Sequence, residues 1–187
     1  GAALKTNGCP LRELTLAGSR LGDTGLAAIG PALLEKKGLV HLDLCGCSLT
    51  SDASYWLLPL LQDSNVRQNE GRRVSELQSW AAGLRDYSKV RRVDVDESGV
   101  DPPIGLEKLL LAGNDLGAKG AIALAHHMAH DYWLRELDLR RNGIDLQALA
   151  QLRAAVVDRE TAEGEKLTVM QPLTLRLDGN AQDSDKM

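Results

Sequence analysis

Cysteine thiols and histidine imidazoles are the side chains of this chain best suited to binding a transition metal. Cys45 and Cys47 form a Cys-x-Cys pair, and Cys9 precedes them. A zinc site of this kind needs a second ligand pair at suitable spacing, which the sequence lacks. We therefore expect no metal or cofactor here, with Cys45 an exposed thiol and Cys47 a buried one.

A second group consists of three histidines within a predicted helix. His126 and His130 have the i, i+4 spacing of two metal ligands, and His127 lies beside them. No glutamate follows His126 as a zinc-protease motif would require, and no third ligand is apparent. The group is expected to form a polar, outward helix face. With no recognisable Ser-His-Asp order either, the sequence favours a protein that is not an enzyme.

A repeated sequence motif determines where these cysteines and histidines lie in the fold. Hydrophobic residues occupy its first, fourth and sixth positions, and Asn, Cys or Ser occupies the ninth. The motif begins at Leu11, Leu39, Val90, Leu106 and Leu134, with a worn sixth copy near Pro172. The first two starts are 28 residues apart, as are the fourth and fifth, and a helical pattern follows each of these strands. At the ninth position, Asn114, Asn142, Asn180 and Cys47 are expected to satisfy backbone groups where the chain turns.

The motif resembles the leucine-rich repeat, and the 28-residue unit resembles its ribonuclease-inhibitor-like, intracellular type. That type also occurs in NOD-like receptors, Ran GTPase-activating protein and tropomodulins. The resemblance covers Leu11 to about Asn180. It implies an α/β solenoid with a parallel sheet on the concave side and helices on the convex side. We expect a single domain over 1–187 that is a piece of a longer protein, because little polar sequence caps either end.

The middle of the chain, 62–105, departs from the repeat. Leu39 and Val90 are 51 residues apart. The intervening residues are either an inserted loop and helix or a degenerate repeat starting near Val66. We favour the degenerate repeat, because it places a helix where a stack needs one. Trp56 and Trp80 are expected to cover the core around this irregularity.

Alternation along each strand places the third, fifth and seventh motif positions on the open face of the sheet. The partner-binding candidates are the ionisable residues there: His41, Asp43, Arg92, Asp94, Asp96, Lys108, Glu136, Asp138, Arg140 and Arg176. If their strands are adjacent, Asp43 and Asp94 repel one another unless a cation intervenes. In the alternative interpretation, Arg92, Lys108 and Arg140 neutralise the carboxylates and leave an ordinary solvated face.

The overall composition excludes several classes of protein. A formal net charge of −4 argues against a general nucleic-acid binder, which needs a basic face. No apolar run approaches the ~20 residues of a membrane span. Three cysteines make an odd number and suggest no disulfide framework, which favours a reducing, cytoplasmic location. The oligomeric state stays open.

Together these features predict a non-catalytic protein-interaction module, or scaffold. Its concave face would bind a protein partner with a basic or mixed-charge surface. One alternative is a regulator of a small GTPase, for which Asn142 and Arg140 are candidate contacts. The other is a structural component of a cytoskeletal assembly.

Overall fold

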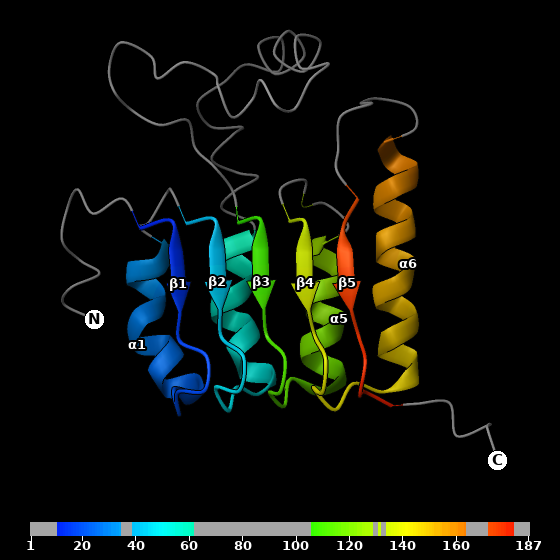
Figure 1. The fold of residues 1–187 in the computed structure, drawn as a ribbon. Coiled ribbons are helices and arrows are strands. Elements are labelled where there is room, and N and C mark those ends of the chain that lie inside the picture. The colour runs from blue at the N-terminus through cyan, green and yellow to red at the C-terminus, as the bar shows by residue number, and fades with distance from the viewer. Residues whose placement is uncertain are drawn as a thin grey trace, which may run out of the picture.

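Five short strands form one parallel sheet in chain order (Figure 1). The computed structural model describes residues 11–34, 39–61, 106–128, 131, 134–163 and 172–181. The strands are β1 (Glu13–Thr15), β2 (His41–Asp43), β3 (Lys108–Leu110), β4 (Glu136–Asp138) and β5 (Thr174–Arg176). The helices are α1 (Gly22–Leu34), η2 (Ser51–Ala53) with helical residues 54–61 after it, α5 (Gly117–Met128) and α6 (Leu146–Glu163). All these helices cover the same side of the sheet, so the predicted α/β solenoid is confirmed.

Equivalent motif positions pair across the sheet, which confirms the predicted alternation. Leu42 is level with Leu109, and Leu109 with Leu137. These three leucines are at most 1% exposed, because the fourth motif position points from the strand toward the helices. The sixth and first motif positions of the same layers are buried as well, and so one continuous leucine core runs along the stack.

One of the two tryptophans that were expected to cover the core lies within the described residues. Trp56, in the helical residues 54–61, packs against the core and lies so close to Gly30 of α1 that a Cβ at that glycine would overlap its ring. The prediction that Trp56 covers the core is therefore confirmed. Trp80 lies outside the described residues.

The preferred interpretation of the middle segment, a degenerate repeat starting near Val66, stays a prediction. Among the described strands, β2 pairs with β1 along one edge and with β3 along the other. For the same reason Asp94 cannot be the strand neighbour of Asp43; that neighbour is Leu110. The segment 62–105, with the motif copy at Val90, lies outside the described residues.

The side chain of Asn114 joins the layer of β3 to the layer of β2. Its Oδ1 accepts hydrogen bonds from the backbone amides of Cys47 at 2.9 Å and Leu49 at 3.0 Å. Its Nδ2 donates to the carbonyls of Leu44 at 2.9 Å and Leu111 at 2.8 Å. One buried amide thus satisfies four backbone groups in two layers.

The same arrangement recurs at the other end of the sheet. Asn180 Oδ1 accepts from the amides of Asn142 at 2.8 Å and Ile144 at 3.2 Å. Its Nδ2 donates to the carbonyls of Leu139 and Leu177, each at 2.8 Å. The structural role predicted for these asparagines is confirmed.

Cys47 occupies the same motif position in the second layer and performs part of the same task. Its buried thiol lies 3.1 Å from the carbonyl oxygen of Leu16 and 3.6 Å from the hydroxyl of Ser19, both in the first layer. A thiol is a weak donor and cannot reproduce the two donors and the acceptor of an amide. The contact between the first two layers is therefore weaker at this point than that between the second and third.

Asn114→Ala is expected to lower the free energy of unfolding by roughly 3 kcal/mol, because it leaves the buried amides of Cys47 and Leu49 without an acceptor. Urea denaturation followed by circular dichroism measures the change. Asp115→Ala removes an exposed side chain at the next position and should cost no more than about 0.5 kcal/mol. Equal losses for the two variants would contradict the role assigned to the buried amide.

Candidate functional site

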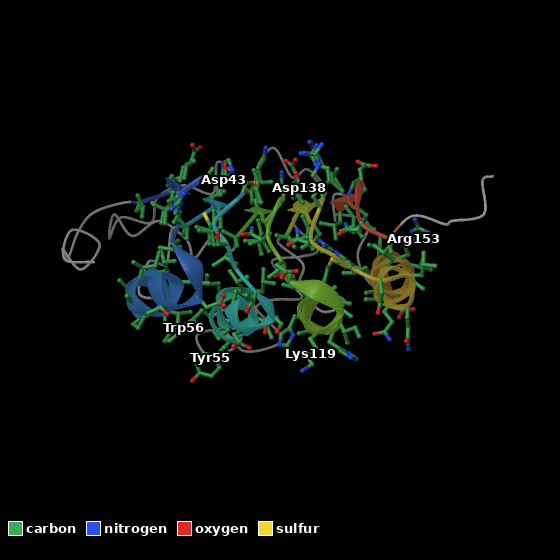
Figure 2. The ribbon with its side chains drawn as sticks, turned by 90° about the horizontal axis from the view of Figure 1, so that it is seen from below. Asp43, Tyr55, Trp56, Lys119, Asp138 and Arg153 are labelled. Carbon is green, nitrogen blue, oxygen red and sulfur yellow. The ribbon has the colours of Figure 1, made fainter. Side chains whose placement is uncertain are left out.

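The candidate surface is the open face of the sheet. Figure 2 shows Asp43 and Asp138 on the side of the sheet opposite the helices, whereas Tyr55, Trp56 and Lys119 lie on the helical side. Seven of the ten predicted contact residues belong to this surface, on the strands or directly after them: His41, Asp43, Lys108, Glu136, Asp138, Arg140 and Arg176. The other three, Arg92, Asp94 and Asp96, lie outside the described residues. We call the described surface the concave face.

On β3, β4 and β5 the charges of the concave face are paired with one another. Glu136 lies between two cations: its Oε2 is 3.2 Å from Lys108 Nζ and its Oε1 is 2.7 Å from the Arg176 guanidinium. These three residues occupy neighbouring strands, where side chains on one face come within ion-pair distance. The carboxylate is largely buried, with 16% of its side chain exposed, and is satisfied on both oxygens.

Asp138 is held by Arg140, two residues further on. The Arg140 Nη2 lies 2.6 Å from Oδ2, and Nε lies 3.0 Å from Oδ1 and 3.1 Å from Oδ2. The backbone amide of Arg140 also donates to Oδ1 at 3.1 Å. The expectation that Asp138 is exposed is wrong: only 3% of the residue is accessible, because the Arg140 side chain folds over it.

This geometry sets the ionisation of the pair. Burial by itself would raise the pKa of Asp138, but the hydrogen bonds and the positive charge of Arg140 outweigh it and lower that pKa below its usual value. The same contact raises the pKa of Arg140. For Lys108 and Arg140, therefore, the alternative interpretation applies: these two cations neutralise carboxylates of the same sheet.

The carboxylates on the first two strands, β1 and β2, differ in their pairing from those on β4. Glu13 is exposed and Asp43 is half-buried, and neither has an ion-pair partner among the described residues. Asp43 Oδ1 accepts a hydrogen bond from the amide of Cys45 at 3.0 Å. His41 is level with Glu13 on the neighbouring strand and two residues before Asp43, and its buried Nε2 has no hydrogen-bond partner among the described residues. Glu13 was not among the predicted contacts, although its third motif position placed it on this face.

Cys45 is half-buried, so the prediction of an exposed thiol is wrong, whereas Cys47 is buried as expected. The carbonyl of Cys45 accepts a hydrogen bond from the amide of Gly18 in the preceding layer, and the amide of Gly46 donates to the carbonyl of Ala112 in the next. Burial, together with the hydrogen bond to Asp43 and its negative charge, raises the pKa of Cys45 to about 12. It is therefore a thiol at neutral pH and a poor nucleophile.

Within the described ranges, no group of three or more His, Cys, Asp or Glu side chains is placed to hold a metal ion. His126 is exposed, and the Nδ1 of His127 lies 2.9 Å from the carbonyl oxygen of Ala123 in its own helix. His130 falls outside the described residues. In the same part of the chain, no helix combines the length and apolar content needed to cross a bilayer.

The two contacts proposed for a GTPase partner are engaged within the chain. Asn142 is fully buried, and its Nδ2 donates to the carbonyls of Leu111 and Arg140. The Arg140 guanidinium is bound to Asp138. To contact a GTPase partner, Asn142 would have to leave its buried position and Arg140 would have to break its ion pair with Asp138.

Parallel strands in register, leucines pointing inward and buried asparagines between layers define the chain as a leucine-rich-repeat protein, a class that binds protein partners. The family model described as Leucine Rich repeat matches residues 9–30, 106–125 and 132–149. The predicted repeat class is thus confirmed. Its ribonuclease-inhibitor-like subtype is compatible with the structure and stays a prediction.

Among known proteins, the chain is similar to centrosomal protein of 78 kDa. It is 30% identical to the mouse and human proteins over 152 residues, or 81% of this chain. The Xenopus tropicalis protein is 45% identical over 74 residues, or 39% of this chain. The chain spans only 17%, 20% and 9% of the length of the mouse, human and Xenopus proteins, respectively.

The Asp138–Arg140 pair predicts a pH dependence of stability. Because the folded-state pKa of Asp138 lies below the usual 3.8, its stabilising effect is complete above that value and is lost as the pH falls through the lowered pKa. Asp138→Asn should therefore reduce the free energy of unfolding at about pH 6, and the difference from the parent should narrow near pH 2.5. Urea titrations at both pH values test this. A difference that does not change with pH would contradict it.

Cys45 should react slowly with iodoacetamide at about pH 8, because little thiolate is present. Asp43→Asn removes a nearby negative charge and should accelerate the reaction, while Asp52→Asn, in η2 and off the concave face, should not. Peptide-resolved mass spectrometry separates Cys45 from the other thiols. Equal rates in the parent and Asp43→Asn would show that Asp43 does not control the thiol.

Proposed function

We propose that this chain is a non-catalytic interaction module of a centrosomal scaffold, and that it binds a basic segment of a protein partner on its concave face. The observation that carries the proposal is the uneven pairing of charge along the sheet. Both carboxylates of β4, Glu136 and Asp138, already have cations at 2.6 to 3.2 Å, whereas Glu13 on β1 and Asp43 on β2 have no ion-pair partner among the described residues.

The energetics favour the first two strands as the contact site for a cation. A lysine or arginine that approaches Glu13 and Asp43 has no internal ion pair to displace. At Glu136 or Asp138 the same cation would have to replace a bonded Arg or Lys, which recovers little free energy. Complementary charge at such an open site also accelerates association and selects the partner.

The strands whose charges are already paired, β3 to β5, contribute to partner binding in another way. Lys108, Arg140 and Arg176 are partly exposed beside their carboxylates, so a mixed-charge partner surface can meet both signs there. Because these side chains are already fixed by their ion pairs, little conformational entropy is lost when a partner binds. Arg92, Asp94 and Asp96 remain candidate contacts of the same kind.

The similarity to centrosomal protein of 78 kDa favours the cytoskeletal alternative over the GTPase one. We therefore place the chain in the cytoplasm, at the centrosome, as a structural component that holds other proteins. A net charge of −4 suits a protein partner better than nucleic acid or an anionic membrane surface.

The test compares the parent chain with the double variant Glu13→Lys/Asp43→Asn. Asn at position 43 retains an oxygen for the Cys45 amide, so the fold should persist. Proteins captured from extracts of dividing cells are identified by mass spectrometry, and the partner's affinity is then measured by calorimetry. We expect about a tenfold rise in Kd for the double variant and a weaker dependence of Kd on salt.

Asp52→Lys is the matched control, since it reverses an exposed carboxylate in η2, off the concave face. It should retain the partner with unchanged affinity. If the double variant also retains the partner at full affinity, β1 and β2 are not the binding site. A fluorescent fusion of the parent that fails to reach the centrosome would contradict the proposed location independently of the binding site.

A further inference from the structure

Leu110 places an apolar side chain at the centre of the concave face. It occupies the fifth motif position of β3, which is the third of five strands. At that position the other four strands carry polar residues: Thr15, Asp43, Asp138 and Arg176. On the described strands Leu110 is the one aliphatic side chain larger than alanine on this face, and it is half-buried. An accessible leucine among polar groups has the arrangement of an interface centre, where apolar contacts lie inside a polar rim.

Short residues follow Leu110 where β3 ends. Ala112 is two residues further on the same face. Beyond it, the eighth motif position of the first three described layers is an exposed glycine: Gly18, Gly46 and Gly113. A glycine carries no side chain, so a partner chain can approach the backbone closely there. The centre of the concave face therefore combines an apolar side chain with accessible backbone.

On the β5 side of Leu110, the cations are more exposed than the carboxylates that they bind. The Arg140 side chain is 42% exposed, against 4% for Asp138. The Arg176 side chain is 46% exposed, against 16% for Glu136. A partner that approaches this side therefore meets guanidinium groups before it meets the carboxylates beneath them.

Of these two cations, Arg176 is the better site for a carboxylate of the partner. Arg140 already uses Nε and Nη2 on Asp138, and the exposed Asp178 after β5 lies near enough to help raise the pKa of Arg140. Arg176 has a single ion pair in the described part of the chain, from Nη2 to Glu136. A guanidinium has five N–H donors, so it can bind a second carboxylate.

On the β1 side of Leu110, the accessible partners for charge are carboxylates. Asp43 is level with Leu110 on the neighbouring strand, and Glu13 lies one strand further out. Figure 2 shows Asp43 on the open side of the sheet. Because neither carboxylate has an ion-pair partner among the described residues, this side favours a cation. The two sides of Leu110 thus select opposite charges.

We propose that the concave face binds an extended segment of its partner through three alternate side chains: a cation at Asp43, an aliphatic side chain at Leu110 and a carboxylate at Arg176. The dimensions agree, because β2 and β5 are three strand spacings apart, about 14 Å, and the first and fifth residues of an extended segment are about 13 Å apart. The partner chain can run in either direction, since the three contacts follow the same order in space. This pattern rests on the proposed function and adds the chemistry of the partner's central residue and of its acidic end.

A phage library of random linear peptides, selected on the 187-residue chain, tests the pattern. Enriched peptides should carry Lys or Arg, a large aliphatic residue and Asp or Glu at alternate positions, with the aliphatic residue in the middle. Enrichment of peptides without this pattern, or no enrichment, would overturn the proposal.

Variants of the chain then test each contact with the tightest peptide, by fluorescence anisotropy. Leu110→Thr should raise Kd about tenfold, because the central apolar contact is lost. Thr15 occupies the same motif position in β1, so this variant should fold. Leu146→Thr is the matched control, since it changes an exposed leucine on α6, off the concave face, and should leave Kd unchanged.

A charge exchange tests the acidic end. Arg176→Glu should weaken the peptide about tenfold, and a peptide with Lys in place of its carboxylate should restore the affinity for this variant. Because restored binding requires a folded chain, the rescue also controls for misfolding. A Lys-substituted peptide that binds the variant no better than the original peptide does would contradict the contact at Arg176.

The double variant Glu13→Lys/Asp43→Asn separates this pattern from the proposed function. We expect it to weaken the peptide together with Leu110→Thr and Arg176→Glu. If the double variant weakens binding while the other two variants do not, the proposed function stands and the three-residue pattern is wrong. If no variant changes the affinity, both are wrong.

Discussion

Buried hydrogen bonds at the ninth motif position hold each layer on the next, and the other features of the structure depend on them. Where a strand ends, backbone amides and carbonyls lose their partners in the sheet, and leaving them unpaired in the core is costly. Asn114 resolves this for two layers at once, with four bonds of 2.8 to 3.0 Å. These four backbone groups are thus satisfied beside the leucine core.

The same register determines the chemistry of the concave face. Because the register makes Lys108 level with Glu136 and places Arg176 diagonally across from it on β5, these three side chains meet and form two ion pairs. One step along the strand would point these side chains into the core instead. The charge pattern of the surface therefore follows from the stacking that buries the leucines, although the two involve different residues.

The fold could be predicted from the sequence because both of its determinants are periodic. The spacing of the leucines gave the strands and their inward face, and the asparagines marked where each strand ends. What a motif cannot specify is which copies stack directly. The Val90 copy fits the pattern of apolar residues, yet β2 pairs with β3, which brings the Asn114 amide to the second layer.

The candidate site was less predictable, since it depends on contacts between side chains rather than on position alone. Alternation placed Asp138 correctly on the concave strand, but its burial results from one conformation of Arg140. Likewise, the partial burial of Cys45 and its hydrogen bond to Asp43 do not follow from its motif position. Sequence reasoning therefore placed these residues on one face of the sheet but could not determine which of its charges are paired.

The direct contact between β2 and β3 explains how the stack tolerates the 44 residues that separate Leu61 from Leu106. Both of these leucines lie in the core, so the chain leaves and re-enters the same packed layer pair. The entropy lost on closing such a connection grows only with the logarithm of its length, about 0.6 kcal/mol for each doubling. The layer contacts are unaffected by that length, because each layer bonds only to its neighbours. Sequence can thus be added between two layers at little cost to stability, while a substitution at Asn114 acts on both layers directly.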